Sequence, residues 1–393
     1  MKKPALIPVL LTLCAAFAFP ADFGLLLEQK AEAENKLFTY TPSFTPWFSW
    51  NGRNGLSFYL SGLLSMEYKY SDDGIDENNG WRQPVLGPEL SIFSIGYRTK
   101  SFFFEAGRII YNDVLSLTAC GLFDGFRIQA GGFRFGAFYS GFLYKESAKI
   151  LMTGEDEASF VKPWGWDCFG DYFASRRIIA SLRLDFPLFE YHNLSLEALG
   201  QFDLNGNDEK LHSQYGEVLL DLYTKKNVGI RIGAFFEAME NGEGIFSAAL
   251  GALACFRTNV PGSLNDGFQL TAKFSSGWWN DTFIAFTPVN SIAQGVIFSG
   301  DFSGLALFRA GYDLLILPSL LMEMNAAYFL RTYSISGIGN LYGGELWASF
   351  TWQPFDDVRL NIGGGAFFPG MGNIYPSGAD TMWKVSAGLS ISL

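Results

Sequence analysis

Runs of about ten residues in which apolar and polar side chains alternate are the feature of this sequence that most restricts its fold. In the run 383–393, for example, Trp383 and Val385 alternate with Lys384 and Ser386. Successive side chains of a β-strand point to opposite faces, so each run predicts a strand with one apolar and one polar face. The chain is therefore predicted to be all-β.

The alternating runs continue from residue 55 to the end of the chain and predict about 16 strands, with a range of 14 to 18. Their connections alternate between long and short, as in an up-and-down antiparallel barrel with long external loops and tight periplasmic turns. A soluble two-sheet sandwich or a carbohydrate-active β-domain is the alternative, but such domains rarely contain so many consecutive hairpins. The predicted strands are 55–70, 84–98, 101–111, 121–130, 132–145, 175–186, 193–203, 214–224, 227–238, 244–257, 267–278, 303–315, 319–332, 341–352, 356–367 and 383–393.

The composition places this sheet in a membrane. Hydrophobic residues make up 49% of the chain and charged residues only 17%, against about 25% charged residues in a typical soluble domain. Beyond the N-terminus no apolar run approaches the ~20 residues that a membrane helix requires. A closed transmembrane barrel is the remaining way to expose so much apolar surface to lipid.

The N-terminus predicts export. Lys2 and Lys3 precede an apolar stretch and an Ala16-Phe17-Ala18 cleavage site, as in a Sec signal peptide, with cleavage after Ala21 as the alternative. The apolar stretch is too short for a membrane anchor, and a large Leu precedes Cys14, which disfavours a lipoprotein. A leader at 1–21 followed by a membrane barrel predicts the outer membrane of a diderm bacterium.

The segment between the leader and the first alternating run is predicted as a periplasmic lead-in, residues 22–50, with the barrel at 51–393. Residues 37–50 could form another strand. Pro42 and Pro46 argue against a central strand there, because proline cannot donate to the hydrogen-bond ladder.

No catalytic or cofactor motif accompanies the strands. His192 and His212 fall in a predicted turn and loop, and Asp208 and Glu209 near His212 are interpreted as parts of a solvated loop. Without a nucleophile elbow, phosphate loop or paired metal-ligand motif, the chain is predicted not to be an enzyme and to need no cofactor or metal. A net charge of −11 disfavours nucleic acid as a partner.

The cysteines fit no zinc spacing. Cys120 and Cys168 flank successive external loops, and a disulfide between them is one interpretation, since thiols oxidise outside the inner membrane. Cys255 is interpreted as a small buried apolar residue.

Directing the polar faces inward places charges of both signs in the lumen, where opposing walls of charge would orient polar solutes. About 16 strands enclose an aqueous space, although pairing of these charges inside a closed lumen is the alternative. The predicted pore-lining cations are Arg127, Arg134, Arg177, Arg183 and Arg231, and the predicted pore-lining acids are Asp185, Glu197, Asp203, Glu217, Asp221 and Glu237.

The external loop 146–174 is the longest. If it folds into the barrel, Glu155, Asp156 and Glu157 would face the arginines and narrow the pore. A surface loop folded over the rim is the equal alternative.

The segment 105–127 resembles the alginate-export and substrate-specific porin group, in which a strand ending in Gly-Arg is followed by a loop and a return strand starting Phe-Asp-Gly. The matching residues here are Gly107-Arg108 and Phe123-Asp124-Gly125, whereas the group's usual Gln after Gly-Arg is replaced by Ile109. The resemblance implies a channel for a small or anionic solute with arginines along its path.

The sequence thus predicts an outer-membrane porin for passive or selective diffusion of small polar or anionic solutes. Its partners would be outer-membrane lipid, the barrel-assembly machinery and those solutes. A transporter of hydrophobic ligands resembling the fatty-acid transporters, and a structural or adhesive surface barrel with a plugged lumen, are the alternatives.

Overall fold

The computed structural model describes residues 21–393 apart from residues 53, 72–79, 82–83, 152–171, 190, 205–211, 225–226, 241–245, 261–265, 281 and 377. Nineteen strands form one sheet in this part of the chain. Two short helices, α2 (Lys145–Ala148) and η2 (Pro369–Met371), lie between strands. No helix in the described ranges is long and apolar enough to cross a membrane. The strands are β1 (Ala21–Glu34), β2 (Leu37–Asn51), β3 (Leu56–Ser71), β4 (Gly80–Trp81), β5 (Val85–Arg98), β6 (Phe102–Asn112), β7 (Cys120–Ala130), β8 (Phe133–Tyr139), β9 (Arg177–Phe189), β10 (His192–Asp203), β11 (His212–Tyr223), β12 (Val228–Glu240), β13 (Phe246–Asn259), β14 (Gly267–Ser275), β15 (Leu305–Leu317), β16 (Leu320–Arg331), β17 (Leu341–Phe355), β18 (Val358–Phe368) and β19 (Met382–Ser392).

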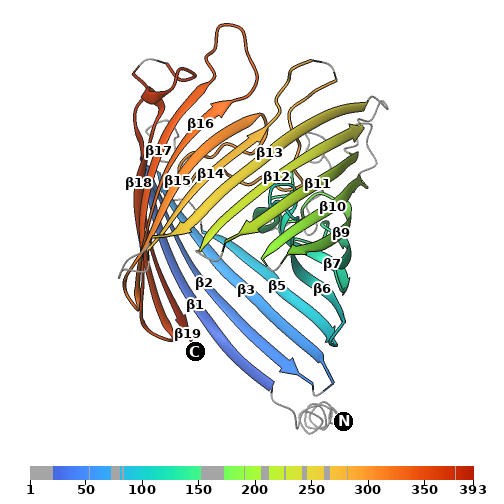
Figure 1. Ribbon diagram of the computed structural model, residues 1–393. Coiled ribbons are helices and arrows are strands. Elements are labelled where there is room, and N and C mark those ends of the chain that lie inside the picture. Colours follow the sequence, from blue (N-terminus) through green and yellow to red (C-terminus); the bar gives the residue numbers. More distant parts are fainter. Residues whose placement is uncertain are drawn as a thin grey trace.

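The sheet closes on itself to form a barrel (Figure 1). β1 pairs antiparallel with β2 on one side and with β19 on the other, with Leu27 opposite Ile391. β4 is a two-residue extension beside β3, whose main partner is β5, so eighteen of the nineteen strands make the wall. The closed antiparallel barrel confirms the predicted fold class, with a strand count at the upper end of the predicted range.

The two strands beyond the predicted sixteen are β1 and β2, so the interpretation of residues 22–50 as a periplasmic lead-in is wrong. Among the described residues, the first strand of the barrel wall begins at Ala21. The prolines are tolerated because β2 pairs continuously with β1, while its ladder to β3 omits residues 41–42 and 45–46, where Pro42 and Pro46 lie. The predicted leader lies outside the described residues, except for Ala21.

The alternation in sequence corresponds to two faces of the wall. Ile232, Phe308 and Ile362 point outward and are 51%, 60% and 59% exposed, as expected for side chains that face lipid. Arg231 and Arg309, the neighbours of the first two along their strands, point into the lumen.

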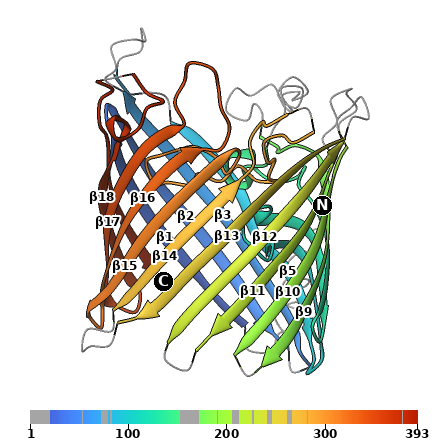
Figure 2. The same ribbon diagram turned by 45° about the horizontal axis from the view of Figure 1, so that its top comes forward.

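The barrel has two unlike ends (Figures 1 and 2). At the long-loop end the connections include residues 113–119, 140–176 and 276–304. At the short-turn end β1 begins and β19 ends, and β15 and β16 are joined by a tight turn. Buried apolar side chains gather inside the barrel toward the long-loop end, where loops cover them.

Candidate functional site: the lumen and its loops

The loop 113–119, between β6 and β7, folds into the lumen. Next to it, the Tyr111 hydroxyl donates to Glu197 Oε1 of β10 (2.6 Å), and the Val114 amide donates to Glu197 Oε2 (2.7 Å). The Thr118 hydroxyl donates to Glu217 of β11. β10 and β11 are not neighbours of β6 or β7 in the wall, so these contacts are made through the interior of the barrel.

A second loop, residues 276–304, lies in the same half of the lumen. The Thr287 amide donates to Glu237 Oε2 of β12 (2.9 Å), and the Tyr215 hydroxyl donates to the Thr287 carbonyl (2.6 Å). Further along, three consecutive amides converge on one buried carboxylate of β17, an arrangement that backbone N–H groups form around anions. The Glu345 oxygens accept the N–H groups of Val296, Ile297 and Phe298 at 2.9, 2.9 and 2.8 Å.

The inward-folded loops also bind one another. The Val289 amide donates to the Thr118 carbonyl (2.7 Å), and the Leu151 amide donates to the Val289 carbonyl (2.9 Å). The Asn290 side chain donates to the carbonyl of Ala148 in the loop after β8 (2.7 Å). Three connections that are distant in sequence thus form one unit inside the barrel, which is named the loop plug here: residues 113–119, 140–151 and 276–304.

An apolar core joins the loop plug to the wall. The rings of Phe286 and Phe235 lie 4.3 Å apart, and those of Phe298 and Phe329 lie 4.2 Å apart. In each pair one ring comes from the loop and the other from an inward-facing strand position, and burial of such rings stabilises their packing. Other buried inward-facing residues of the wall are Leu199, Leu219, Leu307 and Phe367.

The stem of the loop 140–176 is fixed by aromatic residues. Tyr144 and Tyr172 stack with ring centroids 4.8 Å apart, and the Tyr172 hydroxyl donates to the Pro88 carbonyl of β5 (2.6 Å). Burial raises the pKa of both Tyr144 and Tyr172, so these phenols remain protonated.

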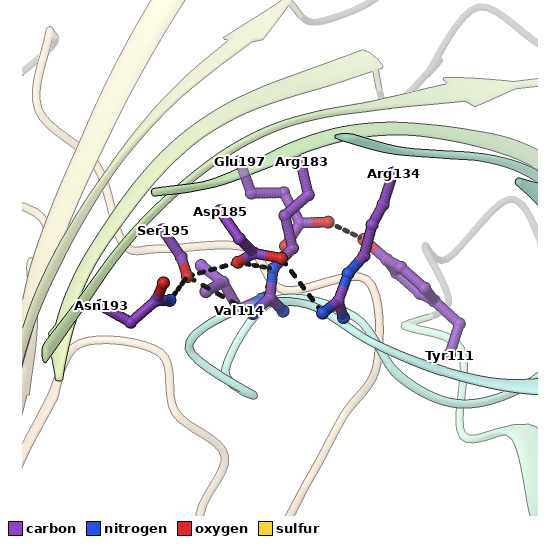
Figure 3. A network of polar contacts seen from close by, with 8 residues as sticks. All are labelled: Tyr111, Val114, Arg134, Arg183, Asp185, Asn193, Ser195 and Glu197. Atoms are coloured by element: carbon purple, nitrogen blue, oxygen red, sulfur yellow. Dashed lines mark hydrogen bonds and ion pairs between the residues drawn. The ribbon is translucent and has the colours of Figure 1, made fainter. Parts of the chain in front are cut away.

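Toward the short-turn end the lumen wall is charged. Arg134 of β8 lies directly opposite Arg183 of β9, and Asp185 binds both, at 3.1 Å from Arg134 Nη2 and 2.9 Å from Arg183 Nε (Figure 3). The Ser195 hydroxyl donates to Asp185 (2.6 Å) and accepts from the Asn193 amide (2.8 Å). One carboxylate thus binds two guanidinium groups, and the group formed by Arg134, Arg183 and Asp185 has a net positive charge.

Two of the remaining predicted cations face the lumen in pairs with acids. Arg127 binds Glu105 at 2.6 Å, and Arg231 binds Asp221 at 2.9 Å. The arginine side chains are 42% and 41% exposed. Arg177 differs, because it is fully buried at the long-loop end of β9 beside Asp203, at 3.6 Å.

Apart from Asp203, which lies beside the buried Arg177, the predicted acids divide into two groups. Asp185 and Asp221 pair with lumen arginines, whereas Glu197, Glu217 and Glu237 are buried and accept hydrogen bonds from the loop plug. The sequence indicated which face these glutamates occupy, but not that loops would cover them. Glu345, with the same role, was not predicted.

The predicted constriction residues Glu155, Asp156 and Glu157 lie outside the described residues, as does Cys168. The Cys120 thiol lies 3.5 Å from Asp113 Oδ1, and its disulfide with Cys168 stays a prediction. The two histidines have structural contacts, since His212 Nδ1 accepts the Asp203 amide (3.2 Å) and His192 Nδ1 accepts the Tyr223 amide (3.3 Å). Within the described ranges no three His, Cys, Asp or Glu side chains are arranged to hold a metal ion.

The two halves of the Gly-Arg and Phe-Asp-Gly motif meet in the structure. Arg108 and Asp124 form a bidentate ion pair across β6 and β7, at 2.8 and 2.9 Å. Arg108 also donates to the carbonyls of Leu90 and Phe142. It therefore ties three neighbouring strands to the first residues after β8.

No protein-family model and no curated protein sequence matches this chain. Solved structures do match its fold. The structure of OpdK from Pseudomonas aeruginosa with vanillate matches with a TM-score of 0.61 and 12% identity over 96% of this chain and 100% of that chain. OccK7 (OpdD) of the same species matches with a TM-score of 0.60 and 13% identity over 96% and 99% of the two chains. OccK2 (OpdF) in complex with glucuronate matches with a TM-score of 0.58 and 14% identity over 95% and 98%. These neighbours are substrate-specific outer-membrane porins, which are channel proteins rather than enzymes, and the chain has their fold.

Proposed function

We propose that this chain is an outer-membrane channel that passes small polar solutes and prefers anionic ones. The observation that carries the proposal is the pair Arg134 and Arg183, which face the lumen on adjacent strands with one shared carboxylate. The Arg134 side chain is 46% exposed. Guanidinium groups bind carboxylates in a bidentate manner, so an anion entering the lumen meets donors of suitable geometry.

The structural neighbours support the same class of solute. Two of them are described with vanillate and with glucuronate, both carboxylate anions. The loop plug narrows the path above the arginines, as constriction loops do in selective channels, so size and charge would both act on a solute.

A transporter for hydrophobic ligands is the alternative, and it would need the apolar inner wall near the long-loop end to bind its ligand. That wall is already covered by Phe286, Phe298 and Phe302 of the loop plug. Residues 22–50, which would have supplied an N-terminal plug, are strands of the wall.

Planar-bilayer recording of the purified protein tests the proposal. We expect stepwise ion conductance with a reversal potential in a KCl gradient that shows a preference for chloride. The double variant Arg134→Ala and Arg183→Ala should lose that preference, while Lys36→Ala, in the tight turn after β1, should retain it. Absence of conductance at every voltage would contradict the channel and favour a structural barrel.

A further inference from the structure

A hollow opens in the inner wall on β14, β15 and β16. These strands lie away from β9 (Figure 1), which with β8 carries Arg134 and Arg183, the arginine patch. At its centre Gly311 lies between Gln269 of β14 and Asn325 of β16, its partners in the two ladders. A Cβ at Gly311 would lie 3.0 Å from Asn325 Oδ1. The missing side chain therefore makes the space, which has a volume of ≈ 130 Å³ and is lined by polar groups.

The end of the hollow toward the short turns is negative. Asp313 of β15 lies directly opposite Glu323 of β16, an arrangement that destabilises a sheet when no cation is near. The Asp313 carboxylate leans over Gly267, where a Cβ would lie 2.7 Å from either of its oxygens. Among the described residues neither carboxylate has an ion-pair partner, in contrast to Arg134 and Arg183 with their shared Asp185.

The end of the hollow toward the loop plug is positive. Arg309 precedes Gly311 by two residues on the same face and donates to the carbonyl of Gln294 in the loop plug. Lys273 Nζ donates to Gln294 Oε1 at 3.1 Å. A guanidinium carries five N–H donors, so Arg309 retains donors for a ligand below the loop.

The two charged ends are separated by about 13 Å between the Cα atoms of Arg309 and Asp313, from the rise of a strand. The Arg309 side chain reaches toward Gln294 of the loop plug, and the amides of Gln269 and Asn325 line the middle of the hollow. At ~30 Å³ per water molecule in the liquid, the hollow has room for about four water molecules, which suits a solute of small amino-acid size that carries both charges.

We propose that this hollow is a binding subsite for small zwitterionic solutes, with the ammonium group between Asp313 and Glu323 and the carboxylate group toward Arg309. The proposal rests on the channel function, in that solutes reach the hollow through the lumen. It assigns to β14–β16 a recognition step distinct from the arginine patch on β8 and β9.

Ligand-observed NMR on the detergent-solubilised full-length protein tests the subsite without requiring conduction. The probes are β-alanine, which carries both charges, and propionate and propylamine, which carry one each. We expect β-alanine to bind about tenfold more tightly than either single-charge probe, a difference of about 1.4 kcal/mol. Equal binding of β-alanine and propylamine would overturn the zwitterion assignment, as would displacement of β-alanine by millimolar Ca²⁺, which would instead indicate a cation site.

Variants separate the two ends of the hollow. The double variant Asp313→Asn and Glu323→Gln should weaken the binding of β-alanine and propylamine by about tenfold and leave the binding of propionate unchanged. Asp356→Asn with Asp357→Asn removes the same charge from the exposed turn after β17 and should change nothing. Gly311→Val fills the hollow and should weaken the binding of all three probes. Gly216→Val, at a position where a Cβ meets nothing within 4 Å, should leave their binding unchanged.

The outcomes distinguish this subsite from the channel itself. Conductance without preferential β-alanine binding refutes the subsite and leaves the channel intact. Preferential binding that depends on Asp313 and Glu323, without conductance, supports the subsite and refutes the channel.

Discussion

Arg134 and Arg183 lie directly opposite each other on β8 and β9, and the single carboxylate of Asp185 binds both. Like charges in this position repel, so the acid is needed for the sheet as well as for the charge of the lumen. Replacement of Asp185 should therefore affect both stability and selectivity.

Asp185→Asn should raise the preference for chloride, because two arginines then face the lumen without a counter-charge. It should also lower the free energy of unfolding by about 1–3 kcal/mol, since hydrogen bonds to a charged group are lost. Reversal potentials and urea unfolding in lipid measure the two effects. Asp356→Asn, in an exposed turn, is the control; an unchanged reversal potential in Asp185→Asn would show that the patch does not lie on the ion path.

Arg177→Met should behave differently from Arg134→Met. Arg177 is fully buried beside Asp203, so its replacement takes one member from a buried ion pair and should cost about 3–5 kcal/mol of stability. Arg134 is half exposed, and its removal should change the ion preference with a smaller loss of stability. Both variants are compared by unfolding midpoint and reversal potential, and a reversed ranking would contradict the assignment of Arg177 as structural.

Glu345→Ala should release the segment 296–298 from the wall, because its amides lose their common acceptor. We expect larger and noisier single-channel conductance, with Glu345→Gln intermediate, as one oxygen acceptor remains. Glu34→Ala, at the tight turn after β1, is the matched control. Identical conductance in wild type and Glu345→Ala would mean that this loop does not limit the path.

Gly233→Val, on the inner face of β12, should displace the loop 113–119. A Cβ at Gly233 would lie 2.3 Å from Leu115 Cδ2, so the Leu115 side chain has to move, and the two further methyl groups of valine press on the loop around it. The barrel should still assemble, with altered conductance. Gly216→Val on the outer face of β11 is the control, and loss of assembly in Gly233→Val alone would indicate that the loop plug is needed for folding.

Deletion of residues 22–51, with the leader retained, should abolish the folded barrel, because β19 would lose its partner β1. The folded form of such barrels is followed by its shifted migration on unheated gels. Deletion of the exposed segment 335–338 between β16 and β17 should leave that form intact. A folded barrel without residues 22–51 would contradict the observed closure.

The alternation of side chains predicted sixteen of the eighteen wall strands, because a period of two reports directly on a two-faced sheet. The alternation did not predict β1 and β2, for local reasons. Leu25, Leu26 and Leu27 form an unbroken apolar run in β1, and β2 contains Pro42 and Pro46. Neither strand keeps a simple alternation, although the ladder between them is continuous.

The loop plug could not be predicted from strand periodicity, which says nothing about the path of a loop. One signal was present in the sequence. Leu199 and Phe235 occupy positions on the otherwise polar inner face of their strands, and both are buried against inward-folded loops. Apolar residues at lumen positions therefore indicate that something packs there, but not which segment.

Part of the negative charge of the chain holds the loop plug in place. The carboxylates concerned are Glu197, Glu217, Glu237 and Glu345. These carboxylates are turned toward backbone amides and hydroxyls and are covered, so a migrating ion does not meet them. The charge exposed in the lumen therefore differs from place to place and does not follow from the formal charge of −11; it is positive at Arg134 and Arg183. The isoelectric point of such a barrel counts buried charges that hold loops in place. The ion preference of the barrel depends only on the charges that remain exposed to water in the lumen.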